Sequence, residues 1–286
     1  MDGPGASVPS ISPTGPFRAA VTTFGVLGWS GFRRYSTYRQ ATIAGAFTNI
    51  IFGFLRCYVL LAVAAGAVGG RPAGYDREQL ATYVWVGQGL LNVVAFWGWT
   101  DLADRIRTGD VVSDLLRPVS PVANYLAQDL GRAGYGMLTR FLAPLLVGTF
   151  FFPLHLPARW ATTPLFALSV LFAVMASFGC RYLVNATGFW LHNARGPLLF
   201  WGLAAGVLSG LYFPLRLLPT GLAITLWVAT PLPSLLQTPL DVLVERDPPA
   251  LQAGLVALQA AWAAALLATC YLVQRRAERK LVVQGG

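Results

Sequence analysis

The chain has 286 residues, of which 55% are hydrophobic and only 12% are charged. Soluble domains carry about 25% charged residues, so the low charge and the long uncharged runs predict an all-α integral membrane protein. The net charge of +9 does not indicate a nucleic-acid partner, because the basic residues are dispersed between apolar runs.

The N-terminal region divides into two parts. Residues 1–17 are rich in Gly, Pro and Ser and predict a disordered tail. In the segment 18–40, large apolar residues fall on one arc of a helix, which predicts an amphipathic helix lying on the cytoplasmic surface of the membrane. An irregular loop, favoured by Gly25, Gly28 and Gly31, is the alternative.

Residues 41–286 are predicted to form one domain with six membrane-spanning helices. The segment 214–242 is apolar, but prolines divide it into pieces too short to cross a bilayer, so it predicts an outer re-entrant helical hairpin between spans five and six. The predicted spans are about 41–68, 81–100, 122–152, 162–190, 197–213 and 251–273. The prolines that define the hairpin are Pro214, Pro219, Pro231 and Pro233.

The basic residues predict the orientation of these spans. With the N-terminus in the cytoplasm, the inner segments hold twelve Arg or Lys residues and the outer segments hold five. Because basic residues concentrate in cytoplasmic loops, both termini are expected to be cytoplasmic.

The chain contains no nucleotide-binding motif of the P-loop type. Its only lysine is Lys280, followed by Leu-Val-Val, whereas a Walker A motif needs Lys followed by Ser or Thr after a Gly-rich turn. The three cysteines and two histidines also lack the spacing of a metal or catalytic site. We therefore expect no catalytic, metal or cofactor-binding residues in this chain, and any ATP and Mg²⁺ must be bound by another polypeptide.

One loop stands out from this apolar background. The stretch "DLADRIRTGDVVSDLLRPVS" (101–120) follows the second predicted span and holds four of the chain's twelve acidic residues. Gly109 is expected to end a helix and Asp110 to cap a new short one. On that short helix Val111, Val112, Leu115 and Leu116 share one side, and Asp110, Ser113, Asp114 and Arg117 share the other. Either the charges simply form a solvated face, or the loop docks a partner through its apolar side.

Three stretches of the chain resemble parts of ABC type-2 transporter permeases of the bacterial six-span branch. "IRTGDVVSDLLRPVSPVANYLAQDLGR" is similar to their first cytoplasmic loop, and "GYDREQLATYVWVGQ" to the short outer loop that leads into the second span. "LYFPLRLLPTGLAITLWVATPLPSLLQTP" resembles their outer re-entrant hairpin. The loop motif is fairly specific, and the other two stretches support it.

The resemblance implies a transport subunit of the bacterial plasma membrane that is not itself an enzyme. Such a permease pairs with a second permease, identical or homologous, and two copies of a separate ABC ATPase bind below. The loop at about 101–119 would be the coupling helix that docks the ATPase. The residues implied in coupling are Asp101, Asp104, Arg105, Gly109, Asp110, Val111, Asp114, Leu115, Leu116, Arg117 and Pro118.

Arginines inside the predicted spans are candidates for a substrate path or a seam between two permeases. Arg56, Arg140 and Arg181 lie within spans one, three and four. Intramembrane arginines usually find a partner, so pairing with Asp129 is the alternative for Arg181, and snorkelling or pairing stays open for Arg56. Several aromatic residues suit either a cavity for an apolar substrate or anchors at the membrane interface. They are Trp85, Phe96, Trp97, Trp99, Phe200 and Trp201.

The predicted function is therefore the permease subunit of an ATP-driven ABC exporter. The resemblance implies drugs, antibiotics, lipids or other amphipathic molecules as substrates, without choosing among them. The alternatives are an ATP-independent secondary transporter, which the lack of an acidic residue deep in any span disfavours, and a membrane scaffold or receptor.

Overall fold

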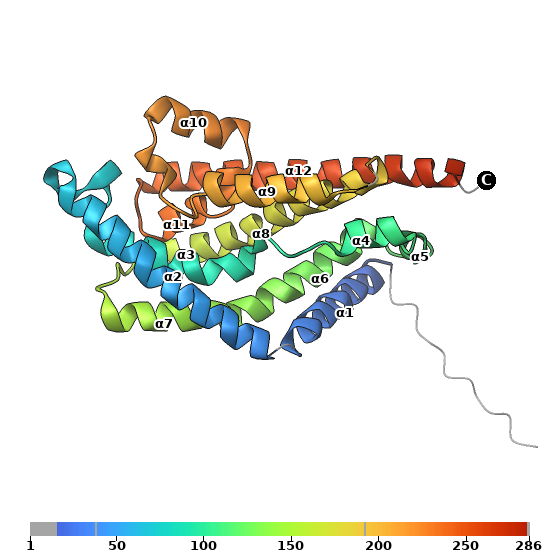
Figure 1. Cartoon of the computed structure of the whole chain (residues 1–286), viewed down its shortest axis with the longest axis horizontal. Helices are drawn as coiled ribbons and strands as arrows, with labels where there is room; N and C mark the ends of the chain where they lie inside the picture. The colour runs from blue at the N-terminus through green and yellow to red at the C-terminus, as the bar shows by residue number, and fades with distance from the viewer. Residues whose placement is uncertain (1–15, 38, 192, 285–286) are drawn as a thin grey trace, which may run out of the picture.

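The computed structural model describes residues 16–37, 39–191 and 193–284. Within these ranges the chain forms helices and no β-strand, which confirms the all-α class. Residues 1–15 of the predicted tail and residues 285–286 lie outside the described ranges. The long helices run side by side along one axis, as Figure 1 shows.

Three helices of the described chain are long and apolar enough to cross a membrane: 43–66, 162–189 and 249–280. They fall on the first, fourth and sixth predicted spans. Two further apolar helices, α9 (Arg195–Leu208) and α10 (Thr220–Ala229), are shorter. Membrane crossing by the second, third and fifth segments stays a prediction, and so does the total of six spans.

The first long helix is α2 (Arg39–Gly66), and two short turns, η1 (Val68–Gly70) and η2 (Pro72–Gly74), follow it. The next helix, α3 (Arg77–Leu90), begins at a capping box between Asp76 and Gln79, in which each side chain accepts the other's backbone N–H. Its continuation η3 (Leu91–Ala95) is π-helical. Ala95 and Gly98 have positive φ angles of 55° and 84°, so the helix stops at Ala95, before the end of the predicted span 81–100.

The third segment is continuous, as predicted for 122–152. It consists of α6 (Pro121–Gly136), a π-helical stretch η4 (Met137–Phe141) and α7 (Leu142–Phe151). The two π-helical stretches, η3 and η4, pack against each other. Such widened turns often mark functional positions in a helix, and here they bring the C-terminal end of the second segment against the middle of the third.

The fourth and sixth segments pack against each other over much of their length. α8 (Thr162–Ala186) ends in the short turn η5 (Thr187–Phe189) and packs along α12 (Pro249–Gln284). Gly179 permits this approach, because a Cβ there would lie 2.7 Å from the Cβ of Leu266. The pair is therefore close-packed where the two helices cross.

The segment predicted as a re-entrant hairpin contains two helices, α10 and α11 (Gln237–Leu243), and the turns η6 (Leu215–Leu217) and η7 (Leu232–Ser234). Pro214, Pro219 and Pro231 each stand immediately before one of these pieces, and Pro233 lies within η7. Proline is tolerated at a helix start, where its missing N–H costs nothing. α10 stands out from the bundle at the end away from α4 (Figure 1).

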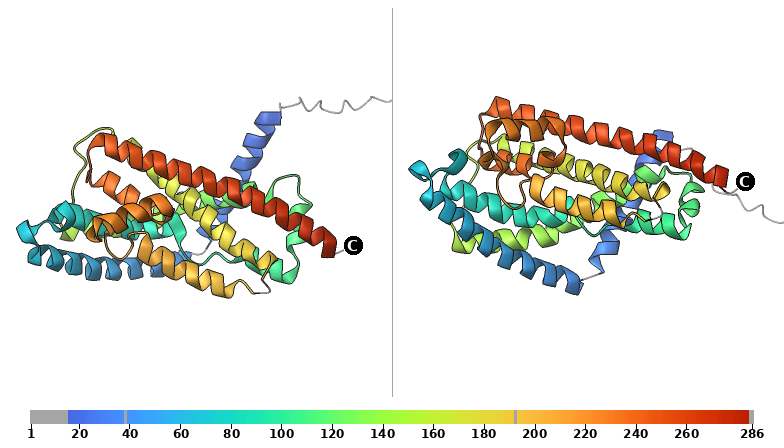
Figure 2. Two further views of the ribbon diagram at one scale, coloured as in Figure 1. Left: turned by 90° about the horizontal axis from the view of Figure 1, so that it is seen from above. Right: turned by 45° about the horizontal axis from the view of Figure 1, so that its top comes forward.

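The N-terminal segment predicted as an interfacial helix is the helix α1 (Pro16–Ser36), so the irregular-loop alternative is wrong. The glycines that suggested a loop serve packing instead. Side chains at Gly31 or Gly131 would clash with the backbone of Gln128 and Gly28 respectively, so α1 and α6 touch backbone to backbone. α1 lies obliquely to the long helices (Figure 2).

Candidate functional site

The charged loop folds as two short helices rather than one. α4 (Asp101–Thr108) ends at Gly109, which is left-handed with φ 83°, and α5 (Val111–Leu115) follows directly. Gly109 thus ends a helix as predicted, although that helix is separate from the second span. Asp110 precedes α5 but makes no capping hydrogen bond, because its carboxylate accepts from the Thr108 hydroxyl at 2.8 Å.

Asp114 is the main correction to the predicted loop. It was expected on the solvated side of the helix, but its side chain is only 4% exposed. Arg105 donates to both its carboxylate oxygens, at 2.8 and 3.0 Å, and the Tyr125 hydroxyl donates at 2.8 Å. These bonds offset the cost of burying a carboxylate. Asp114 therefore locks α5 onto α4 and α6.

The apolar side of the loop also differs from the prediction. Val111 is only 1% exposed and packs inside the protein against Leu102 and Val122, so it cannot face a partner. Val112 and Leu116 are 50% and 82% exposed, while Leu115 is half-buried. The outward apolar pair of this element is therefore Val112 and Leu116.

The remaining charges of the loop tie it to its surroundings or face outward. Asp101 accepts from Arg34 of α1 at 2.7 Å, and Asp104 lies 3.7 Å from Arg107. Arg117 is exposed, 4.0 Å from Asp114, and Pro118 is exposed beside it. Bonds between helices thus fix the start of α4, while the end of α5 is free to meet another molecule.

A buried ionic cluster lies in the same half of the bundle. Asp129 of α6 receives hydrogen bonds of 2.7 Å from Arg132 and from Arg181 of α8. Pairing of Arg181 with Asp129, one of the two predicted alternatives, is confirmed. Arg132 also donates to the backbone carbonyls of Asn92 and Val93 in η3, at 2.5 and 3.0 Å. The sequence prediction omitted Arg132, although its position three residues after Asp129 on a helix is a signal for an ion pair.

The other two arginines within predicted spans behave differently from Arg181. Arg140 donates to the Asn92 side chain at 2.7 Å. The Nε and Nη1 atoms of Arg56 are buried and have no hydrogen-bond partner among the described residues. Arg140 is therefore accounted for within the chain, whereas the two predictions for Arg56 stay open.

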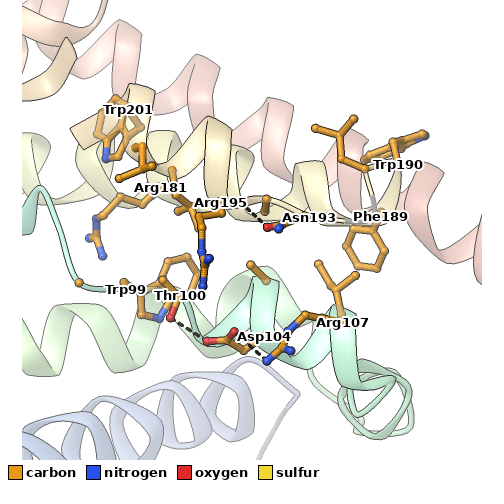
Figure 3. Close-up of a pocket in the computed structure, with 18 of the residues that line it drawn as sticks. Trp99, Thr100, Asp104, Arg107, Arg181, Phe189, Trp190, Asn193, Arg195 and Trp201 are labelled. Atoms are coloured by element: carbon orange, nitrogen blue, oxygen red, sulfur yellow. Dashed lines mark hydrogen bonds and ion pairs between the residues drawn. The ribbon is translucent and has the colours of Figure 1, made fainter. Parts of the chain in front are cut away.

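A cavity of about 870 Å³ opens beside α4, between the ends of α8 and α12 and the start of α9 (Figure 3). Trp97 and Trp201 line it and connect its walls, because their indole N–H groups donate to the carbonyls of Gly202 and Phe96 at 3.0 and 2.9 Å. Of the other aromatic candidates, Phe96 and Trp99 also line it. Trp85 packs elsewhere against Phe54 and Phe152, and Phe200 is exposed outside the cavity.

The opposite end of the bundle holds a polar network absent from the sequence predictions. Gln237 of α11 donates to Asp241 at 2.8 Å and accepts from the Tyr83 hydroxyl at 2.8 Å. Tyr75 donates to Asp241, and Arg216 bonds to Asp241 and Asp247 at 3.2 and 2.5 Å. The network holds the hairpin segment to α3 and to the residues before it, and the links from Gln237 and Asp241 to Tyr75 and Tyr83 span too many residues for a local pattern to reveal them.

At this end Glu245, which follows α11, connects to the loop between α7 and α8 and to the start of α8. Burial disfavours its charge, but hydrogen bonds from the Thr162 hydroxyl and from the backbone N–H groups of Arg159 and Ala158 outweigh that cost and lower its pKa below the usual 4.5. A carboxyl with a lowered pKa stabilises the fold above its unfolded pKa, and that contribution is lost as the pH falls through the folded value.

We therefore expect Glu245→Gln to cost about 1–2 kcal/mol near neutral pH. The difference in thermal midpoint from the wild type should shrink as the pH falls below 4.5 and through the lowered pKa of Glu245, because the protonated wild type then resembles the variant. His155 Nε2 lies 3.9 Å from Glu245 Oε2, so the same convergence in a His155→Gln background assigns the effect to the carboxyl group. A difference that stays constant with pH contradicts the prediction.

The comparisons agree with this architecture. The family model described as ABC-2 family transporter protein matches residues 48–285. No curated protein and no solved structure matches the chain. The matched region includes the charged element α4–α5, the buried ionic cluster and the hairpin segment. The chain belongs to the ABC-2 transporter family and is a membrane protein of the permease type.

Proposed function

We propose that the chain is the permease subunit of an ATP-driven exporter in a bacterial plasma membrane. Two copies of an ABC ATPase, which would bind ATP and Mg²⁺, dock on α4–α5 of the chain and of a second permease, identical or homologous. The substrate is a drug, antibiotic, lipid or other amphipathic molecule. The exposed pair Val112 and Leu116, presented by a firmly held element, is the observation that carries this proposal.

The bonds of α4–α5 support a role in transmitting motion. Its α4 end bonds to α1 through Asp101 and Arg34, and to α8 through Asn185, whose amide oxygen accepts the Ala103 N–H at 3.1 Å. Its α5 end bonds to α6 through Asp114 and Tyr125. A displacement of α5 by a closing ATPase would therefore reach three helices of the bundle through hydrogen bonds rather than through loose loops.

The proposal is tested by copurification and transport. The chain is co-expressed with an ABC ATPase encoded beside its gene, and inverted membrane vesicles are assayed for ATP-dependent uptake of fluorescent amphiphiles. We expect the ATPase to copurify, and uptake to require an intact Walker A lysine in that ATPase. Uptake that persists without ATP, or in the Walker A variant, would indicate a secondary transporter; absence of both association and uptake would overturn the proposal.

A further inference from the structure

The walls of the cavity beside α4 combine aromatic side chains with positive charge. Trp99, Phe189, Trp190 and Trp201 contribute aromatic surface, and Arg181, Arg195 and Lys280 contribute cations. In Figure 3, Arg181 and Trp201 lie at one end of the cavity and Phe189 and Trp190 at the other. Its volume of about 870 Å³ falls within the range of cavities that hold drug-sized ligands.

Two of these cations lack a counter-charge. Asp104, the one acidic residue among the described residues that line the cavity, lies 3.7 Å from Arg107, and together they are neutral. Arg195 and Lys280 pair with no carboxylate in residues 16–37, 39–191 and 193–284. Lys280 instead donates to the Phe189 carbonyl at 3.0 Å and lies over the Trp190 ring. The wall of the cavity therefore has an excess of positive charge.

The excess continues inward. A second cavity of about 360 Å³ shares Phe96, Trp97, Trp99 and Arg181 with the first. It is also lined by Arg132 and Arg140. One carboxylate, that of Asp129, serves both Arg132 and Arg181. An anion in the cavity would thus face a further net positive charge, because Arg132, Arg140 and Arg181 have the single carboxylate of Asp129 among them.

The rim of the cavity is apolar on the outside of the bundle. Leu199 and Phe200 at the start of α9 are 71% and 73% exposed, and Leu191 is also exposed. In the predicted orientation this rim lies beside the cytoplasmic leaflet, because α4 and α5 mark the cytoplasmic end. A ligand reaching the cavity from the membrane would be amphipathic.

We propose that this cavity binds an anionic amphiphile, with its head group attracted by Arg195 and Lys280 of the cavity wall and its hydrophobic body against the tryptophans. Charge-assisted hydrogen bonds to the two cations fix the head group, and burial of apolar surface holds the body. The proposed binding site is argued from the geometry of the chain alone. The further statement that its ligand is the transported substrate rests on the proposed exporter function.

The test uses the purified permease in phosphatidylcholine nanodiscs, titrated with dodecyl phosphate. Tryptophan fluorescence is a direct readout, because Trp97, Trp99, Trp190 and Trp201 line the cavity. We expect Arg195→Gln and Lys280→Gln each to weaken binding about tenfold. Arg276→Gln is the matched control, since it removes the same charge from an exposed position on α12 outside the cavity, and it should change binding less than about twofold. Dodecyl maltoside, which has the same chain and a neutral head, should bind much more weakly.

Three outcomes would overturn the proposal: unchanged binding in the two cavity variants, an equal loss in Arg276→Gln, or equal binding of dodecyl maltoside. If the cavity variants lose binding as expected, two further measurements identify the source of the ligand. Competition by phosphatidylglycerol placed in the nanodiscs indicates a resident lipid, and stimulation of the partner ATPase by dodecyl phosphate indicates a transported one. The titration contains no ATPase, so failure of the exporter function leaves the binding result intact.

Discussion

Asp129→Asn is expected to destabilise the protein by about 3–5 kcal/mol, because it leaves two buried arginines without their counter-charge. Arg132 and Arg181 both bond to Asp129 at 2.7 Å, and all three side chains are less than 10% exposed. The asparagine can still accept a hydrogen bond, so the variant removes the charge while keeping the shape. Thermal unfolding in detergent, followed by tryptophan fluorescence, measures the loss.

Asp104→Asn supplies the matched control for this prediction. Its carboxylate also pairs with an arginine, but the pair is 3.7 Å apart and more than half exposed. Exposed pairs contribute about 0–1 kcal/mol, so Asp104→Asn should melt close to the wild type. If both variants melt alike, the cluster at Asp129 is not a principal source of stability, and Arg132 must be held mainly by the carbonyls of η3.

The difference between these two aspartates also shows how far the sequence could predict the site. Composition and hydropathy indicated the all-helical class and the three longest apolar helices, because both depend on averages over many residues. The helix ending at Gly109 was predictable for a local reason, since glycine adopts the left-handed conformation at little cost.

The burial of the Asp114 side chain was not predictable from such local features. Helical periodicity placed it on a solvated face, but the turn at Gly109 brings Arg105 back against it, and Tyr125 approaches from the next helix. A partner in another element can bury a charge that local periodicity places outside. The same reason explains Val111, whose apolar neighbours Leu102 and Val122 come from α4 and α6.

The helix of the second predicted span ends earlier than hydropathy predicts, because of the backbone conformation at two residues. Hydropathy continued to Trp99, but positive φ angles at Ala95 and Gly98 stop the helix earlier. The irregular stretch that results carries Trp97 and Trp99 into the wall of the cavity. The helix therefore ends earlier than hydropathy predicts at the place where the chain forms a wall of the cavity.

Leu116→Asp is expected to weaken docking of the partner ATPase by about 2–4 kcal/mol, roughly 30- to 700-fold in Kd. Leu116 is 82% exposed at the end of α5, beside Val112, so it is free to contact a partner. A carboxylate placed in such a contact would be buried without a counter-charge. Copurification of the ATPase and ATP-dependent uptake into inverted vesicles should both fall.

Leu156→Asp is the matched control, because Leu156 is also 82% exposed but lies between α7 and α8, away from α4–α5. Since both side chains are exposed, neither variant should lower the free energy of unfolding by more than about 0.5 kcal/mol. A loss of ATPase binding confined to Leu116→Asp places the docking surface on α5. An equal loss in both variants would mean that an added negative charge on the permease weakens assembly wherever it stands, and unaltered binding in Leu116→Asp would show that the ATPase docks elsewhere.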